Sequence, residues 1–263
     1  IFGIYNYCDR WCERCLYTDR CRTFTMEKTL RKRFEEEERR QKTIEENKKF
    51  WDQINNAVSE AAEVYNDLIP EEQNDALPSF VFDIKEEKED VAEAMKDQDE
   101  RIKKAENHPL HKAAYQYQDA VHCWFQEREK ALKITFHNQT KSMRIEYPGM
   151  ENKSVLEQLS QVVYIIQWYY IQIDIKIQRA LMSLLEEKDE SDFFEGMPKD
   201  SEGSAMVALT GIERSLGAWN VLYKTLDSEK ESIAPFITLL FLLRAELVRI
   251  FPGATTFQWP PES

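Results

Sequence analysis

Four cysteines close to the start of the sequence are the residues best suited to chemistry in this chain. They follow the spacing C-x3-C-x2-C-x5-C, at Cys8, Cys12, Cys15 and Cys21. Disulfide frameworks are typical of short, cysteine-rich secreted chains, whereas clustered thiols in a reducing compartment bind metal ions. This chain has only 5 cysteines in 263 residues, and we find no secretory signal before the cluster. The pattern therefore predicts a four-cysteine metal-binding segment over residues 1–25 of a cytoplasmic protein.

The gaps between the cysteines bear on which metal they bind. Structural zinc sites usually combine two C-x2-C pairs across a longer loop, but this segment has one such pair, Cys12 and Cys15. Iron–sulfur clusters accept four cysteines with unequal short gaps. Nearby arginines offset the negative charge of a thiolate-bound cluster, and nearby aromatic side chains exclude water. These side chains are Arg10, Arg14, Arg20, Arg22, Tyr5, Tyr7, Trp11 and Phe24. We therefore expect a [4Fe-4S] cluster, with zinc as the alternative.

The second half of this segment also carries a resemblance. From Cys12 through Tyr17 to Cys21 it reads C-x2-C-x-Y-x3-C, which resembles one end of the iron–sulfur motif in RecB-like nucleases. The resemblance implies a [4Fe-4S] cluster and takes Asp174 and Lys176 as the D-x-K pair of a nuclease. That family splits its cysteines around the nuclease fold, whereas here all four precede it. The first three cysteines are similar in spacing to those of radical-SAM enzymes, but no alternation of strands and helices follows them.

The composition argues against several classes of protein. Only 7 glycines and 9 prolines disfavour a turn-rich β protein. The net charge of −13 disfavours nonspecific binding to nucleic acid, except through a local basic patch beside the cysteines. We find no apolar run long enough for a membrane span, because the longest one, residues 233–243, contains Pro235 and stops at Arg244.

The spacing of apolar residues predicts an all-α fold, in which residues 26–263 form an antiparallel bundle of four to six helices. Helices are expected over the ranges 26–67, 86–106, 109–136, 154–187, 200–226 and 233–251. A linker is expected over 69–85 and a loop over 137–153.

The helix expected over 154–187 is apolar nearly all round, which is typical of a central, buried helix. Ser154 and Glu157 form a capping box at its start. Residues 171–177 alternate as a strand would, but no turn residue interrupts the range, so a helix is predicted. In the next helix a stripe of small side chains predicts close packing of another helix. The stripe consists of Ser204, Ala208, Gly211, Ser215 and Ala218.

Polar residues within the predicted helices indicate a possible second site. Asp119 and His122 resemble the carboxylate-x-x-His element of ferritin-like di-metal bundles, which also need carboxylates from neighbouring helices. Asp174 and Glu213 are candidates for those carboxylates. The alternative is that the charged residues of these helices form interhelical ion pairs, because a buried charge is costly unless it is paired.

The order of these features resembles an uncharacterised bacterial family of helical proteins. The matching parts are the N-terminal four-cysteine motif and the ranges 167–181, 203–219 and 251–254. The resemblance implies a helix at 171–177 and brings no known activity.

These observations together predict an iron–sulfur protein that serves electron transfer or redox sensing with a protein partner. The first alternative is a zinc-stapled helical scaffold for protein–protein interaction. The second is a metal-dependent enzyme with a further site in the helical body. Its candidate residues are Asp119, His122, Asp174 and Glu213.

Overall fold

A computed structural model of the protein describes residues 7–34, 44–68, 91–128, 135–137, 142–144, 152–189 and 199–257. These ranges contain seven α-helices: α1 Arg22–Phe34, α2 Ile44–Leu68, α3 Val91–Asn107, α4 Pro109–Arg128, α5 Lys153–Asp189, α6 Asp200–Thr225 and α7 Lys230–Ile250. One small antiparallel hairpin joins β1 Thr135–His137 to β2 Ser142–Arg144. The all-α class predicted from the sequence is confirmed. None of the helices described here combines the length and the apolar character that crossing a membrane would require.

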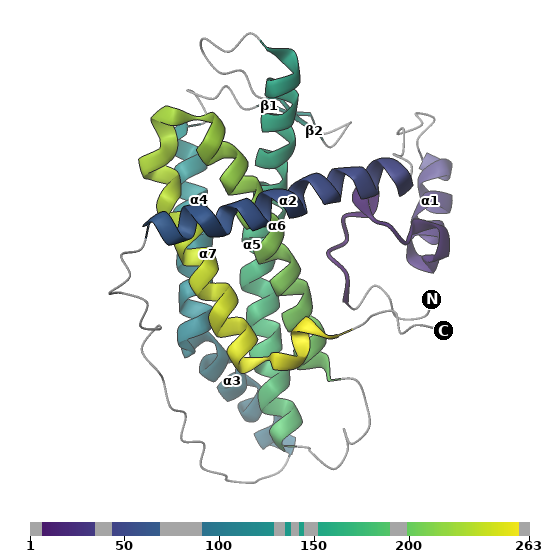
Figure 1. Ribbon diagram of the computed structural model, residues 1–263. Coiled ribbons are helices and arrows are strands. Elements are labelled where there is room, and N and C mark those ends of the chain that lie inside the picture. Colours follow the sequence, from purple (N-terminus) through teal and green to yellow (C-terminus); the bar gives the residue numbers. More distant parts are fainter. Residues whose placement is uncertain are drawn as a thin grey trace.

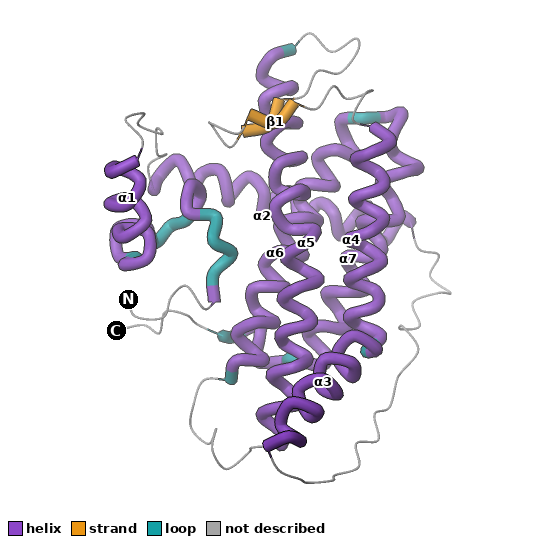
Figure 2. Tube along the Cα trace, turned by 180° about the vertical axis from the view of Figure 1, so that it is seen from behind, coloured by secondary structure: helices purple, strands orange, loops and turns teal. Residues whose placement is uncertain are grey.

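Four helices form the body of the molecule. α4, α5, α6 and α7 lie side by side, and α2 crosses them (Figure 1). α5 and α6 run in opposite directions, and α6 and α7 form a helical hairpin closed by the short turn Asp227–Glu229. Seen from behind, α1 and the segment that precedes it lie to one side of this body, near the start of α2 (Figure 2). The cysteine segment therefore meets the body where α2, α5 and α6 come together.

α6 lies in the middle of three other helices, because it contacts α5, α2 and α7. Its predicted stripe of small residues is buried throughout. A Cβ added at Gly211 would lie 3.1 Å from side-chain atoms of both Ile173 and Tyr169 on α5. The prediction that another helix approaches this stripe closely is confirmed, and that helix is α5.

A closer contact occurs where α2 crosses α6. A Cβ added at Gly217 would lie 2.6 Å from the backbone oxygen of Ile54. Backbone cannot give way as a flexible side chain can, so we expect Gly217→Ala to destabilise the protein by about 1–3 kcal/mol. Gly211→Ala is the matched control, because it brings the same gain in helix propensity but meets only side chains. Urea denaturation measures both variants. Equal stability of the two would contradict a tight crossing of α2 over α6.

Several boundaries differ from those predicted. The capping box at Ser154 is wrong: Asn152 Oδ1 accepts the Ser154 N–H at 3.0 Å, so Asn152 caps α5 and the helix begins one residue earlier, at Lys153. The helix expected over 109–136 is found as α4, which ends at Arg128. β1 begins at Thr135, inside the range expected to be helical, and β2 lies in the range expected to be a loop. For the helix expected over 26–67, the structure describes α1, which begins earlier at Arg22, and α2, while residues 35–43 lie outside the described ranges. Residues 171–177 are helical, as predicted.

Candidate functional site

The cysteine segment is a folded strip with short turns of its own. Two 3-10 turns, Cys12–Arg14 and Thr18–Arg20, follow one another, and α1 begins directly after Cys21. Arg10 has a backbone φ of 55°, which bends the chain between the first two cysteines. All four cysteines of the segment are half-buried, and no disulfide joins any of the five cysteines, all of which lie in described parts of the chain. The four cysteines are therefore unpaired thiols within one short strip of the described structure.

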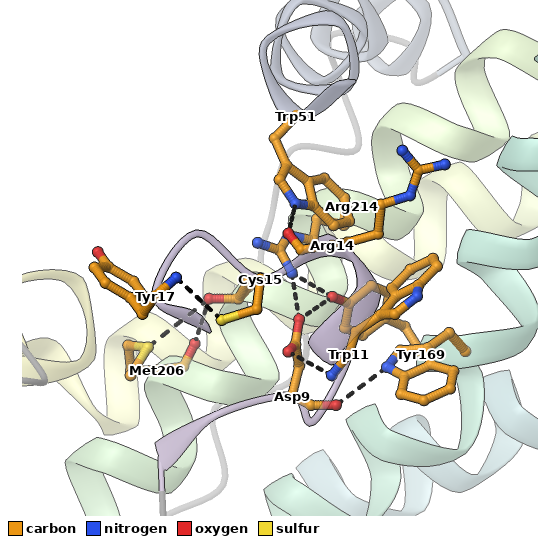
Figure 3. A network of polar contacts seen from close by, with 11 residues as sticks. Asp9, Trp11, Arg14, Cys15, Tyr17, Trp51, Tyr169, Met206 and Arg214 are labelled. Carbon is orange, nitrogen blue, oxygen red and sulfur yellow. Dashed lines mark hydrogen bonds and ion pairs between the residues drawn. The ribbon is translucent and has the colours of Figure 1, made fainter. Parts of the chain in front are cut away.

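Asp9 fastens this strip to the helical body. Its carboxylate accepts hydrogen bonds from the Tyr169 hydroxyl and from the Arg214 guanidinium (Figure 3). The other carboxylate oxygen accepts the Trp11 N–H at 3.0 Å, and the Asp9 carbonyl accepts the Trp168 Nε1–H at 3.1 Å. One residue between two cysteines thus joins the segment to both α5 and α6.

The charges in this contact support one another. Burial and the neighbouring Asp9 carboxylate raise the pKa of Tyr169 well above its usual value, so its hydroxyl stays a donor. Burial opposes the positive charge of Arg214, but its contacts with Tyr169 and Asp9 raise its pKa above the usual value. Arg214 also lies over the Trp51 ring, with 3.6 Å between the guanidinium carbon and the ring centroid. The guanidinium is held charged by Asp9 on one side and by an aromatic face on the other.

Trp11 fills the space beneath the strip. Its side chain is 2 % exposed and lies in the same buried cluster as the helices of the body. It stacks on Trp168 with 5.1 Å between ring centroids and meets Tyr164 edge-on, also at 5.1 Å. Trp51 from α2 meets it edge-on at 5.7 Å and donates its Nε1–H to the Arg14 carbonyl at 2.9 Å. The sequence-based expectation that Trp11 excludes water beside the cysteines agrees with this burial.

The backbone directs N–H groups at the sulfur atoms. The Tyr17 N–H donates to Cys15 Sγ at 3.3 Å, and the Phe24 N–H donates to Cys21 Sγ at 3.4 Å. Burial raises the pKa of the Cys8 thiol, while the Arg10 N–H acts in the opposite direction. Such donors stabilise a thiolate more than a thiol. Three of the four sulfurs therefore have a backbone group suited to the charged, metal-binding form.

Burial, by contrast, keeps protons on the thiols of the metal-free chain. It raises the pKa of Cys12 to about 12, and the nearby acidic and thiol groups add to the effect. It raises the pKa of Cys15 to about 11, and Cys8 and Cys21 contribute to that shift. The four thiols thus lie close enough to influence one another's charge. A metal ion would have to displace their protons on binding.

The donor set fits a thiolate-bound metal. Within the described ranges, no three His, Cys, Asp or Glu side chains already surround a common metal position. The four cysteines nevertheless share one strip and influence one another electrostatically, and three of them receive backbone N–H groups. Four thiolates are the ligands of structural zinc and of iron–sulfur clusters. The residues that would hold such a centre are Cys8, Cys12, Cys15 and Cys21.

Asp119 and His122 do not form the inward-facing pair of a di-metal bundle. Both side chains are exposed on α4, and His122 Nε2 lies 2.8 Å from Gln126 Nε2. The inward face of α4 is taken by apolar and aromatic side chains, including Tyr117 and Trp124. The di-metal arrangement is therefore wrong, because its ligands must project into the body.

The other two candidates contact side chains of neighbouring helices, in two separate places. His111 Nε2 lies 3.2 Å from Asp174 Oδ1, between α4 and α5. Arg244 Nε donates to Glu213 Oε1 at 3.0 Å, between α7 and α6. Arg179 likewise pairs with Asp200, with 2.8 Å between Nη2 and Oδ1. The alternative of interhelical ion pairs is confirmed for Glu213 with Arg244 and for Arg179 with Asp200. Asp174 and His111 form an ion pair only when the imidazole is protonated, and Lys176 makes no ion pair with a described residue. Asp174 and Glu213 therefore do not share a site.

The residues that fasten the strip were not identified from the sequence. Asp9 lies directly after a cysteine, but nothing in the sequence links it to Tyr169 or Arg214. The Tyr7 ring packs against Phe257, with 5.2 Å between centroids, and lies so close to Gly203 that any Cβ there would overlap it. The large aromatic and charged residues between the cysteines could have indicated this contact with the body. A segment that only bound a metal would not need them.

Comparison of the chain with protein-family models, with curated proteins and with solved structures found no match. The resemblance to a bacterial helical family stays a prediction, and function has to be argued from the site itself.

Proposed function

We propose that Cys8, Cys12, Cys15 and Cys21 bind a [4Fe-4S] cluster, and that the protein transfers electrons or senses redox state in the cytoplasm. The observation that carries this proposal is the set of backbone N–H groups directed at Cys15 and Cys21 in a strip anchored to the body. Hydrogen bonds to sulfur and partial burial are the means by which proteins tune an iron–sulfur cluster. The unequal gaps between the cysteines favour iron–sulfur over zinc.

The chain's own residues would hold and shield the centre. A bound cluster supplies one-electron chemistry. Trp11 closes the inner side of the strip to water, and Asp9 fixes its position against α5 and α6. The cysteines are half-buried rather than enclosed, so a protein redox partner could approach from outside. The strip is thus held against the body on its inner side and accessible on its outer side. This arrangement suits the exchange of electrons with such a partner.

A zinc centre is the second candidate, and one observation favours it. The two turns of the strip are single 3-10 turns whose only buried residue is Thr18. A segment with so small a core gains stability from a bound metal, because metal binding supplies folding free energy. In that case the metal would staple the strip, and the helical body would act as a scaffold for a partner protein.

Serine substitutions at the four cysteines test the proposal. Protein purified without oxygen is expected to be brown and to contain about four irons and four sulfides per chain. Replacing any one of the four by serine is expected to lower the bound iron several-fold, because a ligand is lost. The matched control is Cys123→Ser, since Cys123 is exposed on α4, and this variant is expected to keep the wild-type iron content. Absorption spectra with iron, sulfide and zinc analysis measure the outcome.

The same measurements separate the two candidates. Colourless protein with one zinc per chain, lost in the four serine variants but kept in the Cys123 variant, would replace the iron–sulfur proposal by the scaffold. Protein that takes up neither metal, even when refolded with iron and sulfide or with zinc, would overturn both.

A further inference from the structure

Lys176 is a half-buried cation on α5. It makes no hydrogen bond or ion pair with any residue that the structure describes. Burial lowers its pKa, and the positive charges of Arg179 and Arg10 lower it further. Burying a charge without a partner is costly. A lysine kept at such a position therefore requires an explanation.

The contacts of the cysteine strip bring Cys8 to the level of Lys176 along α5. The strip is fastened to α5 at two levels, since Asp9 is bound by Tyr169 at one level and Tyr7 is bound by Asp200 at the other. Asp200 is in turn bound by Arg179 of α5. Cys8 is the residue between these two fastening points.

Lys176 lies between the same two levels on the same face of α5. It lies two helical turns after Tyr169, a spacing that places both side chains on the same face of the helix. It lies one turn before Arg179. These spacings correspond to about 10 Å and about 5 Å along the helix axis. Cys8 acts to raise the pKa of Lys176, which agrees with the two side chains lying near each other.

We propose that Lys176 is the charge partner of the four-cysteine centre: its ammonium group neutralises part of the negative charge that the centre acquires at Cys8. This inference rests on the proposed function. Four thiolates carry more negative charge than the metal they bind can offset, so a centre of either kind is anionic. An ammonium group held beside it favours the bound form and, for an iron–sulfur cluster, favours the reduced form.

The neighbouring cations are less suited to this role. Arg179 already has Asp200, and the Ser183 hydroxyl also donates to that carboxylate, at 2.7 Å. Arg10 is exposed, so solvent screens its charge. Lys176 alone among these three is both half-buried and without a protein acceptor in the described structure. Its ammonium group stands at the end of a flexible four-carbon chain, so it can adjust its position to the Cys8 sulfur.

The experiment compares Lys176→Met with Lys176→Arg in the full chain loaded with its metal. Loss of metal to excess chelator is expected to be about tenfold faster in the Met variant, as for other residues that support metal ligands. The Arg variant keeps the charge and is expected to stay close to the wild type. For the iron–sulfur form, the reduction potential of the Met variant is expected to be more negative than that of the wild type and of the Arg variant. Lys112→Met, at an exposed position on α4, is the control for loss of one surface charge.

The outcomes are distinguishable from failure of the proposed function. If the wild type binds no metal, the proposed function itself fails and the inference fails with it. If the wild type binds metal but Lys176→Met releases it at the wild-type rate and with an unchanged potential, the inference alone is overturned. Circular dichroism and thermal unfolding of the metal-free variants show whether Lys176→Met is folded. If that variant is unfolded, Lys176→Gln replaces it in the same comparison.

Discussion

Replacing Arg214 by methionine is expected to lower the free energy of unfolding by about 2–3 kcal/mol and to release the cysteine strip from the body. The substitution leaves the Asp9 carboxylate without its cation in a site where the two side chains are only 17 % and 22 % exposed. It also removes the guanidinium from the Trp51 face. Removing one partner of a buried pair costs more than the pair contributes, because a desolvated charge remains.

Urea denaturation measures the stability of this variant, and limited trypsin digestion measures the release of the strip. The Arg14 carbonyl is held by the Trp51 Nε1–H, so cleavage after Arg14 is expected to be slow in the wild type and fast in Arg214→Met. Arg244→Met is the matched control, because Arg244 and its partner Glu213 are 43 % and 37 % exposed. Its effect on stability is expected to stay below about 1 kcal/mol. If both variants behave alike, the Asp9 contact does not fasten the strip.

A second large effect is expected in the body, where Trp219→Ala should lower the free energy of unfolding by about 3–5 kcal/mol. Trp219 of α6 is fully buried and stacks on Phe236 of α7, with 4.6 Å between ring centroids. It meets Trp124 of α4 edge-on at 5.1 Å and donates its Nε1–H to the Tyr117 hydroxyl at 3.0 Å. The truncation leaves a cavity where three helices meet, together with a buried hydroxyl that has lost a partner.

Trp219→Phe separates these two contributions. Phenylalanine keeps an aromatic ring against Phe236 but cannot donate to Tyr117, so its expected cost is about 1–3 kcal/mol. Chemical denaturation followed by circular dichroism measures both variants. Metal content per folded chain is expected to stay at the wild-type value, because the aromatic and hydrogen-bond partners of Trp219 in the described structure lie on α4 and α7. A Trp219→Ala variant as stable as the wild type would mean that α4, α6 and α7 do not share this core.

The two substitutions affect different parts of the structure. Trp219 stabilises the packing of the body, whereas Arg214 joins the strip to that body. A variant of Arg214 should therefore change metal retention as well as stability, and a variant of Trp219 should change stability alone. Measuring both properties on both variants tests whether the site depends on the docking of the strip or only on the fold.

The sequence by itself determined the helices and the group of thiols. Helix formation follows from a period of apolar residues that repeats within one segment, so the range expected over 154–187 is found as α5 Lys153–Asp189. Small residues at helical spacing likewise predicted the close approach to α6, at Gly211. The four cysteines lie within 14 residues of sequence, so their grouping needs no tertiary contact.

Only the tertiary structure decided what surrounds those thiols. Asp9 meets Tyr169 and Arg214 across separations of 160 and 205 residues, and no local pattern relates such positions. The error at Asp119 and His122 has the same cause. Their spacing fits a di-metal element, but the apolar residues of α4 face the body, so both side chains are exposed. The sequence marks Lys176 only as one of several charges in an apolar helix, whereas the proposal that it serves Cys8 rests on the two contacts that fasten the strip. Periodicity is a property of one segment, whereas the environment of a site depends on which distant segments pack together.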